Sequence, residues 1–146
     1  MINYANKADS EVIELLKTMN EIPKSITIIL NQLYELEQKL KKHGDPANLS
    51  RNVGKMKDAF AEDGLLVPDS MGGQVLLGFV YEDPMGQAFK ETRTDLDARI
   101  SGSGTENLVV VEVIKPIIRY IANDAHGKFS VVVQKGIVVV ESRKEN

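Results

Sequence analysis

Apolar residues recur every three or four positions between residues 10 and 43, and this is the clearest periodic pattern in the chain. One row continues without a break through Val12, Leu15, Met19, Ile22, Ile26, Ile29, Leu33, Leu36 and Leu40. Alternating steps of three and four are typical of the a/d seam of a coiled coil. A helix from residue 12 to 40 would be about 43 Å long. Because no second helix of that length is expected in the chain, the row predicts self-association, most simply as a homodimer.

A proline interrupts the composition of this helix but not its periodicity. Within a helix, proline removes a hydrogen bond and clashes with the preceding turn, at a cost of about 3 kcal/mol. Pro23 nevertheless lies between Ile22 and Ile26, where the heptad phase is kept. Two interpretations remain open: the helix is kinked at Pro23, or two helices meet there. The unbroken phase favours the kink.

A second, shorter helix is predicted after the segment "KKHGDPAN", which combines basic residues, a glycine and an Asp-Pro pair. Leu49, Val53, Met56 and Phe60 share one face of it. Two helices joined by a short turn predict a hairpin, and two hairpins in a dimer would make a four-helix bundle. We therefore expect residues 1–66 to form a helical dimerisation region.

The second half of the chain changes to short β-branched runs. "QVLLGFVYE", "NLVVVEVIKP", "FSVVVQ" and "GIVVVES" are bounded by glycine, proline, asparagine and aspartate, and each predicts a strand. The segment "KPIIRYIANDAHGKFS" contains turn signals and indicates a hairpin connection. We expect residues 67–146 to form a small, mostly antiparallel β domain. The predicted fold class is therefore α+β, with a dimeric coiled coil or four-helix bundle followed by the β domain.

Composition restricts the function classes. The chain has 146 residues, of which 42% are hydrophobic and 27% charged, as in an ordinary folded domain. A net charge of −3 gives no reason to expect a nucleic-acid partner. The absence of cysteine excludes disulfides and thiol chemistry. The N-terminal residues lack the pattern of a signal peptide, and no apolar run reaches the roughly 20 residues that span a bilayer. We expect a soluble, cytoplasmic protein with no membrane partner.

Residues that could carry catalysis or bind a metal are sparse. The only histidines are His43, at a predicted helix end, and His126, in a predicted turn. A zinc site needs three or four ligands, and this chain has no cysteine and two distant histidines. The glycines of "GSGTEN" and "SMGGQ" lack the strand–loop–helix context of a nucleotide-binding loop. We therefore expect no metal and no cofactor.

One pair of carboxylates could in principle exchange protons. Asp95 and Asp97 are two residues apart and would share a face if the segment is extended. Arg93 and Arg99 alternate with them, which favours a surface of mixed charge over an active site. The chain is predicted not to be an enzyme.

The stretch "DPMGQAF" places Asp83, Pro84, Gly86 and Phe89 in an Asp-Pro-x-Gly-x-x-Phe pattern. With the order of a heptad helix, a shorter helix and a terminal β domain, this pattern resembles GrpE, the family of nucleotide exchange factors of DnaK-type chaperones. "NLVVVEVIKPII" and "VVQKGIVVV" resemble later strands of that family, and the resemblance covers residues 10–141.

The resemblance implies a function without covalent chemistry. The β domain would be a wing that contacts the nucleotide-binding domain of the chaperone and holds its cleft open, so that ADP leaves. It implies that Phe89 anchors the turn in the β core and that charged side chains nearby contact the partner. The partner-binding residues implied are Phe89, Arg93, Asp95, Arg99, Lys128 and Val140.

Three hypotheses follow. The first is a homodimeric GrpE-like exchange factor. The second keeps the fold but makes the chain a dimeric adaptor for another protein, because Lys90-Glu91 and Thr94-Asp95-Leu96 stand where the family has Asp-Pro and His-Glu-Ala. The third, ranked last, is a small enzyme that uses Asp95 and Asp97.

Overall fold

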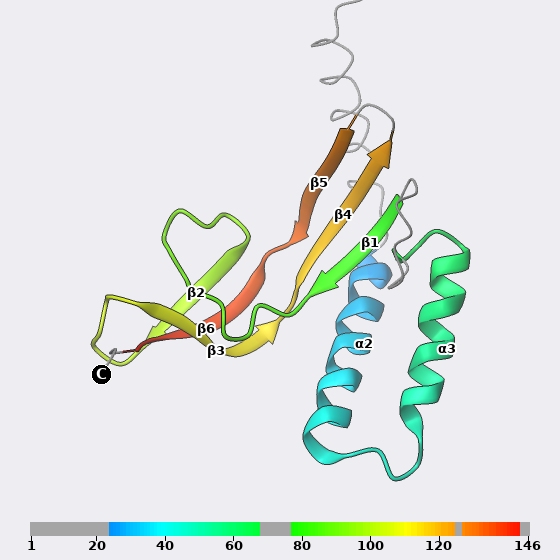
Figure 1. Ribbon diagram of the computed structural model, residues 1–146, viewed down its shortest axis with the longest axis horizontal. Helices are drawn as coiled ribbons and strands as arrows, with labels where there is room; N and C mark the ends of the chain where they lie inside the picture. The colour runs from blue at the N-terminus through cyan, green and yellow to red at the C-terminus, as the bar shows by residue number, and fades with distance from the viewer. Residues whose placement is uncertain (1–23, 68–76, 125–126, 144–146) are drawn as a thin grey trace, which may run out of the picture.

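The computed structural model describes residues 24–67, 77–124 and 127–143. Its elements are α2 (Lys24–His43), α3 (Leu49–Glu62), β1 (Leu77–Glu82), β2 (Leu96–Ser101), β3 (Leu108–Lys115), β4 (Ile117–Asp124), β5 (Gly127–Gln134) and β6 (Gly136–Ser142). The predicted α+β class is confirmed, with the helical hairpin at one end of the molecule and the strands extending away from it (Figure 1). Val12, Leu15, Met19 and Ile22, and the question of a kink at Pro23, lie outside the described residues.

The turn between the helices is fixed by its own residues. Gly44 has a left-handed backbone (φ 81°), and its N–H donates to the Leu40 carbonyl at 2.9 Å, which ends α2. A residue with a Cβ is strained in this conformation, so glycine is favoured here. The Asp45 carboxylate accepts the backbone N–H groups of Leu49 (2.6 Å) and Ser50 (3.0 Å). It caps the first turn of α3, and the hydrogen bonds from Ser50 lower the pKa of Asp45.

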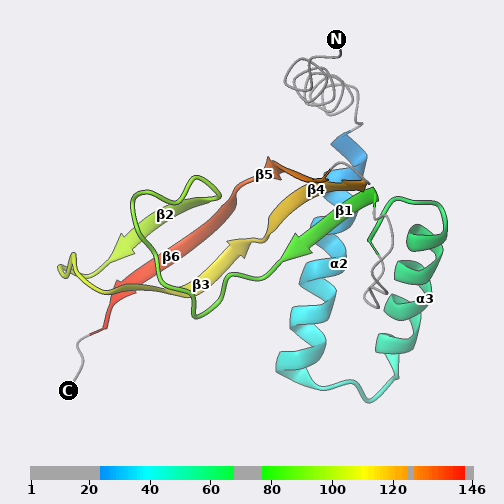
Figure 2. The ribbon, with the colours of Figure 1, turned by 45° about the horizontal axis from the view of Figure 1, so that its top comes forward.

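The strands form two three-stranded sheets, in the order β1-β4-β5 (sheet A) and β2-β6-β3 (sheet B). The β2–β6 pair is parallel and the other described pairs are antiparallel, which agrees with the expected mostly antiparallel region. β3 continues into β4 after Pro116, and β5 into β6 after Lys135. One long, bent hairpin therefore supplies two strands to each sheet (Figure 2).

Two of these strands were not expected. The segment 117–124 was predicted to be part of a connection but is β4, the central strand of sheet A. Pairing on both edges outweighs the local turn signals, which fall at the end of this strand. The segment 96–101, for which no strand was predicted, is β2. Its side chains alternate, and Leu96 faces the interior.

The buried apolar residues form two cores. The helix-side core consists of Leu30, Leu33, Val53, Leu66, Phe79 and Ile118. The wing core consists of Leu96, Leu108, Val110, Ile117, Val138 and Val140. Ile117 and Ile118 are neighbours that point to opposite faces of the same strand, so each belongs to a different core.

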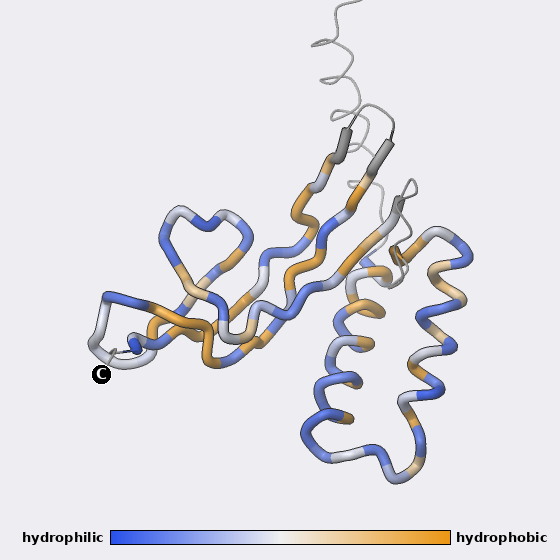
Figure 3. The backbone as a smooth tube through the Cα atoms, in the orientation of Figure 1, coloured by the Kyte–Doolittle hydropathy of each residue, from blue (hydrophilic) through white to orange (hydrophobic). Residues whose placement is uncertain are grey.

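The heptad row of α2 is divided between two surfaces, although apolar residues recur along both helices (Figure 3). Leu33 is buried in the helix-side core, and Ile26 and Leu40 pack against it. Ile29 and Leu36 remain 39% and 37% exposed. The premise that only a second copy could cover the row is therefore wrong for Ile26, Leu33 and Leu40, because α3 and sheet A of the same chain cover these three residues.

Polar contacts fasten α2 to sheet A. The side-chain amides of Asn31 and Gln134 exchange two hydrogen bonds, of 3.0 and 2.9 Å, between α2 and the end of β5. The Tyr81 hydroxyl donates to the Glu37 carboxylate. These partly buried bonds fix the side of α2 that faces the sheet.

Candidate partner-binding site

The turn after β1 adopts one closed conformation that its sequence explains. The Asp83 carboxylate accepts the N–H of Met85 at 3.0 Å, and the Gln87 N–H donates to the Pro84 carbonyl at 3.1 Å. Gly86 has φ 81°, which favours glycine, and Pro84 is fully buried. Aspartate, proline and glycine therefore each have a structural role in this turn.

The same turn is joined to the free edge of β3. The N–H of Gly86 donates to the Val110 carbonyl (3.0 Å), the N–H of Val110 to the Gln87 carbonyl (2.9 Å), and the N–H of Phe89 to the Leu108 carbonyl (2.8 Å). The Phe89 ring is partly buried and packs against the wing core. It anchors the turn as expected, and its role toward a partner stays a prediction.

Four charged side chains form a network where the two sheets meet. Arg93 binds the Asp95 carboxylate through two bonds of 3.0 Å. Arg119 of β4 donates to Asp95 at 2.6 Å and to Glu82 at 3.1 Å. The hydrogen bonds from Arg93, and then those from Arg119, lower the pKa of the Asp95 carboxyl to about 2, against the opposite effect of burial. Asp95 precedes β2, so the network ties sheet B to sheet A.

This network corrects the expectation that Arg93 and Asp95 contact a partner from the exposed side. Their side chains are 24% and 16% exposed; they bind each other, and Asp95 also binds Arg119. Glu82 and Arg119 were missed because they lie far from Asp95 in the sequence. The one available signal was an arginine within the apolar run "IIRYI". Arg99, by contrast, is exposed on β2.

The two carboxylates proposed as a pair lie in different surroundings. Asp95 is bound by two guanidinium groups, whereas Asp97 is 66% exposed and lies 3.8 Å from the Lys135 ammonium group. Ionised and shared by two arginines, Asp95 is not free to accept a proton from a substrate.

The last two predicted site residues have different outcomes. Val140 is fully buried in the wing core, so its side chain is not available to a partner, and this prediction is corrected. The reason is that strand residues alternate between faces, and Val140 falls on the inner one. Lys128 lies in β5 opposite Asn123, and its side chain is outside the described part of the structure.

A hollow of about 390 Å³ opens at the end of sheet B, between the segment after the turn and the loop after β2. It is lined by Ala88, Phe89, Lys90, Glu91, Ile100, Thr105, Asn107 and Leu108. Of the apolar residues in this lining, Ile100 is 46% exposed, whereas Leu108 is buried. The lining combines apolar side chains, such as Phe89, Ile100 and Leu108, with the charged Lys90 and Glu91, which suits an apolar side chain of a protein partner.

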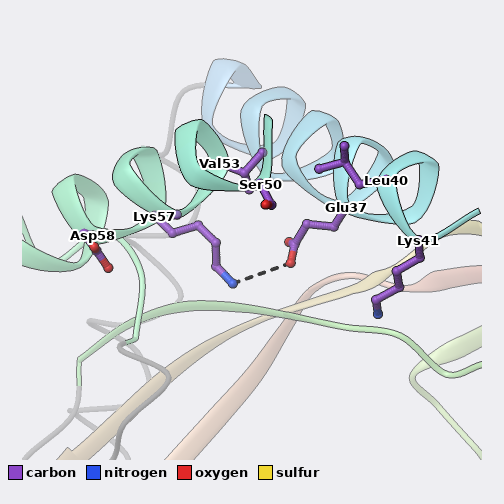
Figure 4. A pocket seen from close by; sticks show the side chains of 8 residues that line it. Glu37, Leu40, Lys41, Ser50, Val53, Lys57 and Asp58 are labelled. Carbon is purple, nitrogen blue, oxygen red and sulfur yellow. Dashed lines mark ion pairs between the residues drawn. The ribbon is translucent and has the colours of Figure 1, made fainter. Parts of the chain in front are cut away.

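A second groove of about 290 Å³ lies between the two helices (Figure 4). The Lys57 ammonium group lies 3.7 Å from the Glu37 carboxylate across it. Leu40, Val53 and Gly54 are also part of its lining. Within the described residues no group of three or more histidines, aspartates or glutamates is placed to hold a metal ion.

Comparison of the chain with models of protein families, with curated proteins and with solved structures found no match. None of the helices in the described ranges is long and apolar enough to cross a membrane.

Proposed function

We propose that this chain is a homodimeric, GrpE-like exchange factor that promotes ADP release from a DnaK-type chaperone by binding its open nucleotide-binding cleft. The observation that carries the proposal is the order of the elements. A heptad helix and a shorter helix form a hairpin, and a β wing follows in which the turn "DPMGQAF" is locked to β3. This order and this turn are the features on which the resemblance rests.

The construction of the wing supports the proposed mechanism. An exchange factor works by binding the open conformation of the chaperone more tightly than the closed one. Binding free energy is lost if the wing itself has to be ordered on contact. Here the turn is fixed to β3 by three backbone bonds, and Asp95 and Arg119 tie the two sheets together. The wing is therefore organised before it meets a partner.

An apolar face of the helical hairpin supports the proposed dimer. Four exposed side chains occupy this face: Ile29, Leu36, Leu49 and Met56, at 39%, 37%, 48% and 40% exposure. Each helix contributes a pair that is seven residues apart, so each pair lies along one side of its helix. By helical spacing, Ile29 and Leu36 lie beside the buried row of α2 on the side away from the groove residues Glu37 and Lys41. Leu49 and Met56 lie beside Val53 of α3, on the side away from Gly54 and Lys57. The two pairs therefore share the face of the hairpin opposite the groove. A second hairpin packed against this face would complete a four-helix bundle.

The test is stopped-flow release of a fluorescent ADP from the DnaK-type chaperone of the same organism. The proposal expects at least a tenfold acceleration by the wild-type chain. An Ile100→Asp variant, altered in the hollow beside Phe89, is expected to lose most of this acceleration. Arg51→Glu, an exposed change on α3, serves as the control and should leave it intact. No acceleration by a correctly folded wild-type dimer would refute exchange activity.

The second candidate is a dimeric adaptor of the same fold without exchange activity. The observation that favours it is the lining of the hollow, where Lys90 and Glu91 replace the residues expected from the resemblance. This candidate predicts no effect on ADP release, together with capture of a protein that is not a chaperone. Capture of the chaperone and of no other protein, in a complex that Ile100→Asp abolishes, would contradict this candidate.

A further inference from the structure

Sheet B has one face that the wing core does not use. Leu96, Ala98, Val138 and Val140 point toward the wing core. The alternate residues of β2 and β6 therefore point to the opposite side. Helices α2 and α3 lie beside sheet A and away from sheet B (Figures 1 and 2). We call it the outer face. Its centre consists of Asp97, Arg99, Glu112, Lys115, Ile137 and Val139, and Glu141 and Lys135 lie at its two ends.

The strand register arranges these residues in two rows. Asp97 pairs with Ile137, and Ile137 pairs with Lys115 on the other side. Arg99 pairs with Val139, and Val139 pairs with Glu112. Each row therefore has an apolar residue in the middle, with opposite charges at its two ends, and the charges are reversed from one row to the next.

A local irregularity of β3 produces this arrangement. Glu112 and Lys115 are three positions apart, and in a regular strand they would point to opposite faces. The register shifts between Val110 and Glu112 and again between Val113 and Lys115. The second shift brings Lys115 to the same face as Glu112. Bulges often redirect a side chain, and this one adds Lys115 to the outer face as the fourth of its central charged residues.

The centre of the outer face is apolar and open. Ile137 is 36% exposed and Val139 is half-buried, while the four charged side chains around them are exposed. Asp97 is 66% exposed, and its contact with Lys135 is long at 3.8 Å. An exposed pair of this kind contributes little to stability, so these charges are available to a partner.

We propose that the outer face of sheet B binds the same face of a second copy of this chain. The four charges are complementary to themselves when a copy is turned over onto the face. With the two-fold axis across the strands, between the two rows, Asp97 meets Arg99 of the partner subunit and Lys115 meets Glu112 of the partner subunit. Glu141 then meets Lys135 of the partner subunit, and the apolar centres come together. An axis along β6 would instead bring Glu141 against Glu141 of the partner subunit.

The contact is small, so the association is weak and depends on concentration. Six side chains with their surroundings fall at the low end of the interfaces that bury less than about 1,200 Å² in total. This second contact is separate from the helical face of the proposed dimer. It would join monomers if the hairpins do not pair, and would join dimers if they do.

The test is sedimentation velocity over a range of about 10 μM to 1 mM, which brackets the dissociation constants of weak complexes. One variant, Asp97→Lys with Glu112→Lys, leaves only basic side chains at the four central charged positions. Another, Arg99→Glu with Lys115→Glu, leaves only acidic ones there. Each is expected to weaken the association at least about tenfold, because like charges then meet at these positions. An equimolar mixture of the two is expected to recover it, because every pair is then opposite in sign.

Controls change the net charge by the same amount on exposed positions of the helices: Glu35→Lys with Glu62→Lys, and Arg51→Glu with Lys55→Glu. These variants should associate like the wild type. Circular dichroism establishes that each variant is folded. The proposal is overturned if the wild type shows no association step up to about 1 mM, a range that covers weak complexes. It is also overturned if the charge variants associate as the wild type does, or if mixing them produces no heteromeric species. If the wild type does not associate, a different protein becomes the candidate partner of the outer face.

Discussion

Replacing Asp95 with asparagine removes the negative charge that Arg93 and Arg119 share, and the cost can be worked out from the structure. The pKa of this carboxyl is lowered from 3.8 to about 2. At about 1.4 kcal/mol per pH unit, the difference contributes about 2 kcal/mol to the free energy of unfolding at neutral pH. We therefore expect Asp95→Asn to lower the stability by about 2 kcal/mol at pH 6.

The direction of the pKa shift determines how the stability difference between the wild type and Asp95→Asn changes with pH. Because the pKa is lower in the folded than in the unfolded chain, the contribution is fully present above about pH 4 and is lost as the pH falls toward 2. The difference between wild type and Asp95→Asn should therefore shrink to about 1 kcal/mol at pH 3 and to a small value at pH 2. Protonated aspartic acid and asparagine have nearly the same shape, so little else changes.

Urea unfolding followed by far-ultraviolet circular dichroism measures this difference, which suits a chain without tryptophan. Asp97→Asn is the matched control: it lies two residues away, is 66% exposed, and should change the stability by less than about 0.5 kcal/mol at every pH. A cost of Asp95→Asn that stays constant between pH 6 and pH 3 would refute the reasoning. An equal cost for Asp97→Asn would refute it as well.

Three further substitutions test other parts of the structure. Gly54→Ala should raise the stability by about 1 kcal/mol, because a Cβ in this helical position meets nothing within 4 Å; a lower melting temperature would contradict this. Gly78→Ala should lower the stability by more than about 1 kcal/mol, because φ is 148° and the new Cβ would lie 3.0 Å from the Gly64 carbonyl oxygen; urea unfolding showing no loss would count against it. Leu36→Asp should leave the monomer fold intact, since this side chain is 37% exposed, but should convert the proposed dimer to monomers in sedimentation; a dimer that persists would place the contact elsewhere.

The helices could be predicted from the sequence because their signals are local. The periodic apolar residues of 24–43 and the cap around Gly44 and Asp45 lie within a few residues of one another. The surface that covers α2 could not be predicted in the same way. Ile26 and Ile29 are successive members of the heptad row, at its two alternating positions, yet only the first packs in the helix-side core. That difference depends on where sheet A docks, which is a long-range property of the chain.

In the wing, even more of the structure depends on long-range contacts that local sequence signals do not predict. The turn after β1 was recognisable because aspartate, proline and glycine determine its backbone locally. The state of Asp95 was not, because its second arginine lies 24 residues away on another sheet. β2 was concealed by its charges, although Leu96, Ala98 and Ile100 alternate as a strand requires. Charge patterns in a sequence thus did not reveal which charges would be paired and which would be left at the surface.

The position of Ile117 and Ile118 at the joint between the sheets has a mechanical consequence. Each side chain is almost completely buried, and each is held in a different core. A swivel of one sheet against the other would withdraw at least one of them, and exposing a single isoleucine costs roughly 1.5–3 kcal/mol. The joint between the two sheets therefore resists bending. If a partner displaces sheet B, we expect sheet A and α2 to move with it.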